Sequence, residues 1–116
     1  MPSDCIFCRI ASGEIPANIV KKTGQFVAFR DLDPKAPTHV LIIPATHLVS
    51  ARDAKGSDGE LLLGRLVAFA TQVATELGLD DTGYRIVANT GPDGGQSVFH
   101  LHLHLLGGRK LTWPPG

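Results

Sequence analysis

The sequence predicts an α+β fold, in which an antiparallel sheet of about five strands carries one long helix and a short N-terminal helix. The first observation is a single long helical pattern, because apolar residues recur every three or four positions across 58–78. The second is that short segments rich in β-branched and aromatic residues lie on both sides of this helix. Strands grouped before and after one helix favour antiparallel pairing.

The N-terminal half is predicted to contain one short helix and three strands. Ser3 or Asp4 can cap a helix that Gly13 would end. Residues 18–32 indicate two strands around a glycine turn. Residues 39–44, HVLIIP, are apolar on both faces, which predicts a central strand that is covered on both sides.

The long helix is predicted to present one apolar face and to end at Gly78, a residue that favours helix C-termini. The apolar face consists of Leu62, Leu66, Phe69, Val73 and Leu77. Residues 83–90 and 97–108 predict two further strands, and the loop 91–96 between them is rich in turn-forming residues. The tail 111–116 contains two prolines and is expected to be irregular.

The composition indicates a globular chain of 116 residues, which by its size predicts a single domain over residues 1–116. Its formal net charge is zero and its basic residues are scattered, so nothing indicates a nucleic-acid partner. No run reaches the roughly 18 apolar residues that cross a bilayer. The N-terminus has no basic region followed by an apolar one, as a secretory signal would. We therefore expect no membrane partner, a cytoplasmic location and reduced cysteines.

Three of the five histidines of the chain occur at alternate positions in the predicted last strand, as His100, His102 and His104. Successive side chains of a strand point to opposite faces, so the histidines would share one face. The other face of the strand would pack on the core beneath the long helix. This apolar face consists of Phe99, Leu101, Leu103 and Leu105.

Two functions suit a row of imidazoles. All three could bind one metal ion, but neighbours on a regular strand face lie about 6.6 Å apart, which places the outer pair too far apart to share an ion well. Alternatively, one imidazole attacks an electrophile such as phosphorus while its neighbours orient it and manage charge. Gly94 and Gly95 in the preceding loop favour the second function, because their backbone can approach an anion closely.

The segment HLHLHLL, residues 100–106, resembles the signature of the histidine triad (HIT) superfamily. Residues 31–47, residues 83–109 and the terminal WPPG resemble the Hint branch, the nucleoside phosphoramidases, in the same order along the chain. The resemblance covers nearly the whole sequence and implies a single HIT domain over residues 1–116.

The resemblance implies hydrolysis of the P–N bond of adenosine or guanosine 5′-phosphoramidates, and of related aminoacyl adenylates, to a nucleoside monophosphate. His102 would attack the α-phosphorus and form a nucleotidyl-histidine intermediate that water then hydrolyses. His104 and the backbone around Gly95 and Gln96 would hold the phosphate, and Ser97 would contact the leaving group.

The resemblance also implies the surroundings of the triad. Asn89 would border the phosphate, and His39 would lie near the triad and orient His102 through His100 or a backbone carbonyl. Asp31 would accept hydrogen bonds from the ribose hydroxyls. The nucleoside would occupy an apolar slot formed by Ile6, Phe7, Ile10, Ile15, Phe29 and Leu32.

Cys5 and Cys8 form a Cys-x-x-Cys pair, which by itself could be a redox pair or half of a zinc site. Family members with this cysteine pair bind zinc, and the resemblance implies His47 and His100 as the other two ligands. Animal members of the branch lack the cysteines, so the chain resembles the prokaryotic type. Four protein ligands would make the zinc structural, joining the N-terminal helix to the sheet.

The resemblance further implies a homodimer in which Trp113 reaches the active site of the partner. Two alternatives to a phosphoramidase remain open from the sequence. One is a dinucleoside polyphosphate hydrolase of another HIT branch, and the other is a non-catalytic nucleotide-binding module that regulates a partner protein.

Overall fold

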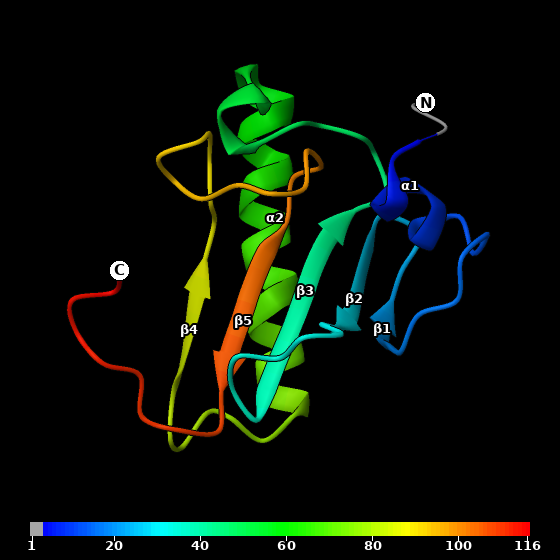
Figure 1. The fold of residues 1–116 in the computed structure, drawn as a ribbon. Helices are drawn as coiled ribbons and strands as arrows, with labels where there is room; N and C mark the ends of the chain where they lie inside the picture. Colours follow the sequence, from blue (N-terminus) through cyan, green and yellow to red (C-terminus); the bar gives the residue numbers. More distant parts are fainter. Residues whose placement is uncertain (1–3) are drawn as a thin grey trace.

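The structure is a computed structural model that describes residues 4–116. Its elements are α1 (Ile6–Ala11), β1 (Ile19–Lys22), β2 (Phe26–Arg30), β3 (Thr38–Pro44), a 3-10 turn (Ala51–Asp53), α2 (Gly56–Glu76), β4 (Tyr84–Val87) and β5 (Leu103–Gly107). A five-stranded antiparallel sheet carries one long and one short helix (Figure 1), which confirms the predicted α+β fold.

The strands lie in the order β1-β2-β3-β5-β4, and every neighbouring pair is antiparallel. β3 is therefore the central strand, as its continuous apolar run predicted. β5 lies between β3 and β4, so His104 is opposite Leu41 on one side and Val87 on the other. This pairing places the last histidine of the triad in the middle of the sheet.

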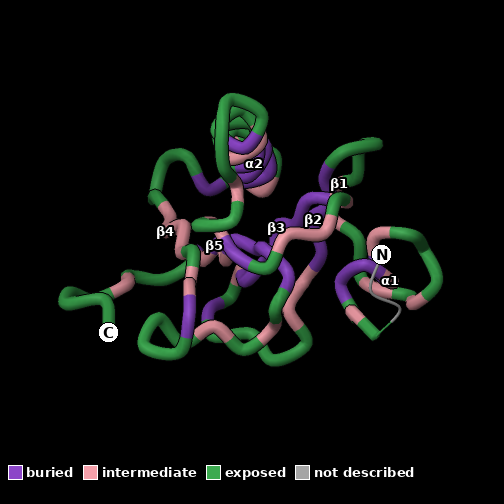
Figure 2. Tube along the Cα trace, turned by 90° about the horizontal axis from the view of Figure 1, so that it is seen from above, coloured by how far each residue is buried: buried purple, intermediate pink, exposed green. Residues whose placement is uncertain are grey.

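The sheet has a core on each face because β3 is apolar on both. Val40 and Ile42 belong to the larger core, which α2 covers on one face of the sheet (Figure 2). Leu41 and Ile43 belong to a smaller core on the other face. There they are joined by Phe7 and other residues of α1 and β2. The smaller core fixes α1 against β3.

The predicted apolar face of α2 is confirmed. Leu66, Phe69 and Val73 are buried, and the other two predicted residues are partly buried against the same core. The helix begins two residues before the predicted position, with the first-turn bond from Gly59 N–H to the Lys55 carbonyl at 3.1 Å. A Cβ at Gly59 would lie 2.3 Å from the backbone carbon of Ala54, so only glycine fits this first turn.

The short N-terminal helix begins at a cysteine cap. The Sγ of Cys5 accepts the N–H of Cys8 at 3.4 Å, which takes the role predicted for Ser3 or Asp4. Asp4 precedes the cap, and Ser3 lies outside the described residues. Gly13 follows the helix with a φ of +83°, and the chain turns there as predicted.

The last strand was predicted from residue 97, but it begins at Leu103. The register explains this, because Leu103 pairs with Ile42, and two residues further on Leu101 would lie opposite Pro44, which has no N–H for the ladder. The chain instead bends, and the Leu101 N–H donates to the Leu48 carbonyl at 2.6 Å. The prediction that Phe99 faces the core is wrong, because its side chain is 62% exposed.

Candidate functional site

Four side chains that can bind a metal converge where α1 meets the loop after β3 and the bend before β5. Cys5 and Cys8 come from α1 and its cap, His47 from the loop after β3, and His100 from the bend before β5. The Nδ1 of His100 lies 3.3 Å from the Cys5 Sγ, 3.5 Å from the Cys8 Sγ and 3.2 Å from the His47 Nδ1. The Cys8 Sγ is 3.3 Å from the His47 Nδ1.

These distances suit a tetrahedral zinc ion. Bonds of about 2.3 Å to sulfur and about 2.05 Å to nitrogen imply S···N separations of about 3.5 Å and an N···N separation of about 3.3 Å. The four donor atoms all lie within 4.8 Å of one another. Four protein side chains would complete the tetrahedral coordination, as in structural zinc sites, and two of them, Cys8 and His100, are fully buried.

The electrostatics of the cluster also suit a cation. Burial, with a hydrogen bond and the charge of Cys5, raises the pKa of the Cys8 thiol to about 11. A bound divalent cation would stabilise the thiolate that this environment otherwise disfavours. Burial lowers the pKa of His100 and keeps its ring neutral. Its Nε2–H donates to the Pro44 carbonyl at 2.9 Å, which leaves the Nδ1 lone pair for the metal.

The middle histidine is held in one tautomer by a backbone carbonyl. The Nδ1 of His102 lies 2.7 Å from the carbonyl oxygen of His100. A carbonyl only accepts, so Nδ1 carries a hydrogen, and in the neutral ring the lone pair is on Nε2. The Phe7 ring packs edge-on against the imidazole, with centroids 5.2 Å apart. The hydrogen bond therefore fixes one nitrogen of His102, and in a neutral ring the other nitrogen would be nucleophilic.

A relay of hydrogen bonds fixes the other two imidazoles. The Lys35 N–H donates to the Nδ1 of His39 at 3.0 Å, so the hydrogen of that ring is on Nε2. His39 Nε2–H donates in turn to the Nδ1 of His104 at 2.9 Å. The hydrogen of His104 is then on Nε2, where it can donate to an oxyanion. His39 thus contacts His104, and the carbonyl that fixes His102 belongs to His100.

Asp31, His39 and His104 form a second convergence of possible ligands. The Asp31 Oδ2 lies 3.5 Å from the His39 Nε2. That nitrogen carries the hydrogen that His39 donates to His104, so in this tautomer it has no lone pair for a metal. Burial and then the neighbouring imidazoles His102 and His39 lower the pKa of His104 to about 4. Burial likewise lowers the pKa of His39, so both rings are neutral at pH 7.

The residues predicted for a nucleoside slot divide into two groups. Phe7, Ile10 and Phe29 are buried in the smaller core, and Ile15 packs against it. Leu32 is 99% exposed beside Asp31, and Ile6 is also exposed. Of the buried members, Phe7 packs its ring against the imidazoles of His100 and His102.

The loop before the triad does not offer the two backbone donors that we expected. The N–H of Gly95 donates to Pro92 and that of Gln96 donates to Gly91, each at 3.1 Å, so both are used within the turn. The Gln96 side chain accepts the Gly91 N–H at 3.0 Å and donates to the Val49 carbonyl at 2.5 Å. In this structure the two N–H groups therefore have partners within the loop, and their role toward a phosphate stays a prediction.

Ser97 lines an open cavity of about 440 Å³ beside the metal cluster. Cys5, His47, Val98 and Phe99 also line it. Ser97 precedes β5, which begins at Leu103, so strand alternation does not determine the direction of its side chain.

Two other predicted residues lie outside this cavity. Asn89 lies just after β4 and is partly buried. Trp113 is 81% exposed in the tail, which Arg85 holds by donating to the Thr112 carbonyl at 2.9 Å.

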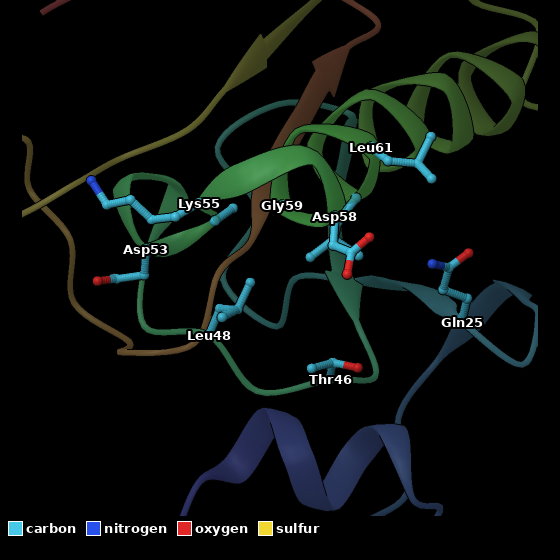
Figure 3. Close-up of a pocket in the computed structure, with 10 residues that line it drawn as sticks. Gln25, Thr46, Leu48, Asp53, Lys55, Asp58, Gly59 and Leu61 are labelled. Carbon is cyan, nitrogen blue, oxygen red and sulfur yellow. The ribbon is translucent and has the colours of Figure 1, made fainter.

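A further cavity of about 390 Å³ lies between the start of α2 and the loop after β3 (Figure 3). Thr46 and Leu48 line it, whereas His47 between them belongs to the metal cluster. No histidine or cysteine of the described residues lines this cavity, so it is separate from the candidate site. Within residues 4–116, no helix has the length and apolar character that crossing a membrane requires.

Comparison with known proteins identifies the family. A family model described as HIT domain matches residues 12–111. A 14 kDa zinc-binding protein of Zea mays is 48% identical over 115 residues, which are 98% of this chain and 89% of that protein. The chain therefore belongs to the HIT family.

Solved structures agree with this assignment. A HIT family hydrolase from Legionella pneumophila Philadelphia 1 superposes with a TM-score of 0.93 and 50% identity, covering 97% of this chain and all of that one. A histidine triad nucleotide-binding protein from Candida albicans has a TM-score of 0.78 and 33% identity, with 88% and 73% covered. The fold is that of HIT family hydrolases and nucleotide-binding proteins.

Sequence reasoning missed the backbone groups that set the tautomers. These are the Lys35 N–H and the carbonyls of Pro44 and His100. A backbone group has the same chemistry at every residue, so no side-chain pattern reveals which one meets an imidazole. The end of β3 at a proline was the one available signal, because it predicts that the partner strand departs there.

Proposed function

We propose that the protein hydrolyses the P–N bond of purine nucleoside 5′-phosphoramidates, and cleaves related aminoacyl adenylates, with His102 as the nucleophile. The observation that carries the proposal is the 2.7 Å hydrogen bond from His102 Nδ1–H to the His100 carbonyl. When this buried ring is neutral, the hydrogen bond leaves its Nε2 lone pair available for attack on phosphorus. The hydrolases among the structural neighbours and the resemblance to the phosphoramidase branch support the same chemistry.

The reaction takes two displacements at phosphorus. First, His102 Nε2 bonds to the α-phosphorus, the P–N bond to the amine breaks, and the amine nitrogen takes up a proton as it leaves. Water then bonds to phosphorus, the bond to His102 breaks, and the nucleoside monophosphate is released while a proton passes to solvent. Each step builds charge on the phosphoryl oxygens, which a donor aimed at them stabilises.

His104 is the donor that we assign to a phosphoryl oxygen. The relay from Lys35 through His39 leaves the hydrogen of His104 on Nε2, facing away from His39. Ser97 would contact the leaving amine. We assign the ribose hydroxyls to Asp31, whose Oδ1 already accepts the Asp33 N–H at 2.8 Å and whose Oδ2 remains for a further donor.

We further propose that Cys5, Cys8, His47 and His100 bind a structural zinc ion. The separations of the donor atoms and the closed ligand set support this, and the Zea mays relative carries a zinc-binding name. The ion would supply a cross-link between α1, the loop after β3 and the bend before β5. A reducing compartment such as the cytoplasm would keep the two thiols available to it.

A homodimer completes the proposed assembly. The indole of Trp113 is 81% exposed in the single chain, although large aromatic side chains usually dock against another surface. We propose that it reaches the active site of a second copy.

The test is a parallel assay of adenosine 5′-phosphoramidate and a diadenosine polyphosphate with the zinc-loaded protein. We expect faster turnover of the phosphoramidate and an AMP adduct on His102 when the reaction is stopped early and the peptides are weighed. Faster turnover of the polyphosphate would establish the other hydrolase activity instead. Binding of AMP without turnover of either compound would indicate a nucleotide-binding regulatory module.

A further inference from the structure

An arginine outside the candidate site is bound to the loop that carries the histidine relay. This loop, residues 31–37, joins β2 to β3, and the Lys35 N–H within it sets the tautomer of His39. The carbonyl of Lys35 accepts the Nη2–H of Arg109 at 2.9 Å and its Nε–H at 3.3 Å. One residue of the loop therefore contacts the relay through its N–H and Arg109 through its carbonyl.

The loop has little other support at this carbonyl. It forms no helix or strand, and the ion pair between Lys35 Nζ and Asp33 is exposed to solvent, where such a pair contributes little. The Asp31 N–H donates to the His39 carbonyl at 3.0 Å and closes the base of the loop. In the described part of the chain, every hydrogen bond to the Lys35 carbonyl comes from Arg109. Arg109 is therefore the group that fixes this part of the loop.

Glycine at the end of β5 brings Arg109 to the loop. Gly107 ends the strand opposite Thr38, and Gly108 follows with a φ of +89°. A Cβ at Gly108 would lie 2.8 Å from the Cβ of Pro37, so the close approach of the two segments requires glycine there. The turn after β5 therefore lies against the loop, and Arg109 is the next residue of this turn.

The guanidinium of Arg109 is used to hold carbonyls. Its Nη1–H donates to the Lys110 carbonyl at 3.2 Å, while two other N–H groups donate to Lys35. No carboxylate of the described residues forms an ion pair with it. A planar fork that spans two carbonyls is specific to arginine, because lysine has one nitrogen on a flexible chain. Its charge also strengthens these bonds, since hydrogen bonds from charged donors exceed neutral ones.

The direction of the relay depends on the position of the Lys35 N–H. This N–H and the carbonyl of the same residue flank one Cα, so a displaced carbonyl moves the N–H away from the Nδ1 of His39. The His39 hydrogen can then lie on Nδ1, which leaves a lone pair on Nε2. His104 would then donate from Nδ1 to His39 and bear a lone pair on its own Nε2. A lone pair repels a phosphoryl oxygen, whereas an N–H stabilises it.

We propose that Arg109 is a positioning residue for His104, the donor that we assign to a phosphoryl oxygen. By holding the Lys35 carbonyl, Arg109 keeps the relay in the direction from Lys35 through His39 to His104, and the Nε2 of His104 carries hydrogen. The inference rests on the proposed function, but the direction of the relay can be measured without turnover.

The experiment uses protein labelled with ¹⁵N in its histidines and compares wild type with Arg109→Ala. Long-range ¹H–¹⁵N spectra distinguish a ring nitrogen that carries hydrogen from one that bears a lone pair. In wild type we expect hydrogen on Nε2 of both His39 and His104, and in Arg109→Ala we expect both tautomers of each ring. The kcat for adenosine 5′-phosphoramidate should fall about tenfold while KM changes little, because a charge-assisted hydrogen bond that supports the donor is lost.

Lys110→Ala is the matched control. It removes a positive charge from the adjacent residue but keeps the backbone carbonyl that Arg109 contacts. Both rings should keep the wild-type tautomer, with unchanged kcat. A control that mixed the tautomers as strongly as Arg109→Ala would overturn the proposal, since the loss of charge near the loop would then explain the effect.

Arg109→Lys keeps the test decisive if Arg109→Ala does not fold. One lysine nitrogen cannot hold both carbonyls, so this variant should also show both tautomers and a reduced kcat. Wild-type tautomers in Arg109→Ala, or in Arg109→Lys where the alanine variant does not fold, would overturn the proposal. Mixed tautomers with an unchanged kcat would overturn it as well. Mixed tautomers in variants of a protein that turns over no phosphoramidate would instead refute the proposed function alone.

Discussion

The low pKa of His104 predicts a specific dependence of stability on pH. Burial and the neighbouring imidazoles His102 and His39 lower this pKa to about 4, while Asp31 opposes them. An unfolded histidine has a pKa of about 6.5. Between these two values the unfolded chain binds a proton that the folded protein does not. The contribution of neutral His104 to the free energy of unfolding is therefore complete above about pH 6.5, and it is lost as the pH falls toward 4.

The magnitude follows from the two pKa values. Each tenfold difference in proton affinity corresponds to about 1.36 kcal/mol. The two pKa values therefore set an upper limit of about 3.4 kcal/mol on the stability that protonation of His104 can remove. His104 is only partly buried, and solvent screens a ring of that kind. We therefore expect His104 to account for about 1–2 kcal/mol of the stability lost between pH 7 and pH 4.5.

The assay compares wild type with His104→Asn, which cannot take up this proton. Urea unfolding followed by circular dichroism at both pH values gives the free energy of unfolding of each protein. The wild type should lose more stability than the variant by about 1–2 kcal/mol. Any loss of zinc at low pH affects both proteins and cancels in the difference. Equal losses in the two proteins would show that His104 titrates normally and that our account of its burial is wrong.

Three further predictions concern the metal, the nucleophile and the assembly. Replacing Cys5 and Cys8 by serine should prevent zinc binding and lower the melting temperature by about 10 °C. This shift corresponds to a loss of about 2.7 kcal/mol in the free energy of unfolding for a chain of this size. An unchanged melting temperature in calorimetry would refute a structural ion. His102→Asn should abolish phosphoramidate turnover and retain AMP binding by calorimetric titration, and turnover within tenfold of wild type would exclude His102 as the nucleophile. The protein should sediment as a dimer at micromolar concentration, and Trp113→Ala should alter KM; a fully active monomer would contradict the shared site.

Local sequence patterns were sufficient to predict the arrangement of the main elements. The apolar spacing of 58–78 predicted the buried face of α2, because a helix repeats its environment every three to four residues. The continuous apolar run of 39–44 predicted the central strand, since both of its faces meet a core. The spacing of Cys5 and Cys8 left a redox pair and a zinc site open, whereas the family resemblance implied His47 and His100 as further ligands, and the cluster brings these four side chains together.

The same reasoning failed where the chain leaves its regular pattern. The alternation of His100, His102 and His104 suggested three equivalent side chains on one strand face, with Phe99 opposite them. Pro44 cannot continue the ladder, so the strand begins only at Leu103. Because the residues before Leu103 do not pair with β3, the backbone bends and the side chain of Phe99 lies at the surface.

The sequence by itself determined the fold class, the central strand, the buried face of the helix and the residue types of both clusters, because these depend on periodicity and side-chain chemistry. The family resemblance already implied different roles for the three histidines of the triad, but only the tertiary structure decided which contacts distinguish them. His100 turns its ring to the metal cluster, His102 is fixed by the carbonyl of His100, and His104 receives the hydrogen of His39. These differences depend on backbone groups and partners far apart in the chain, such as Pro44 with His100, and such groups meet only when the sheet and α1 have assembled.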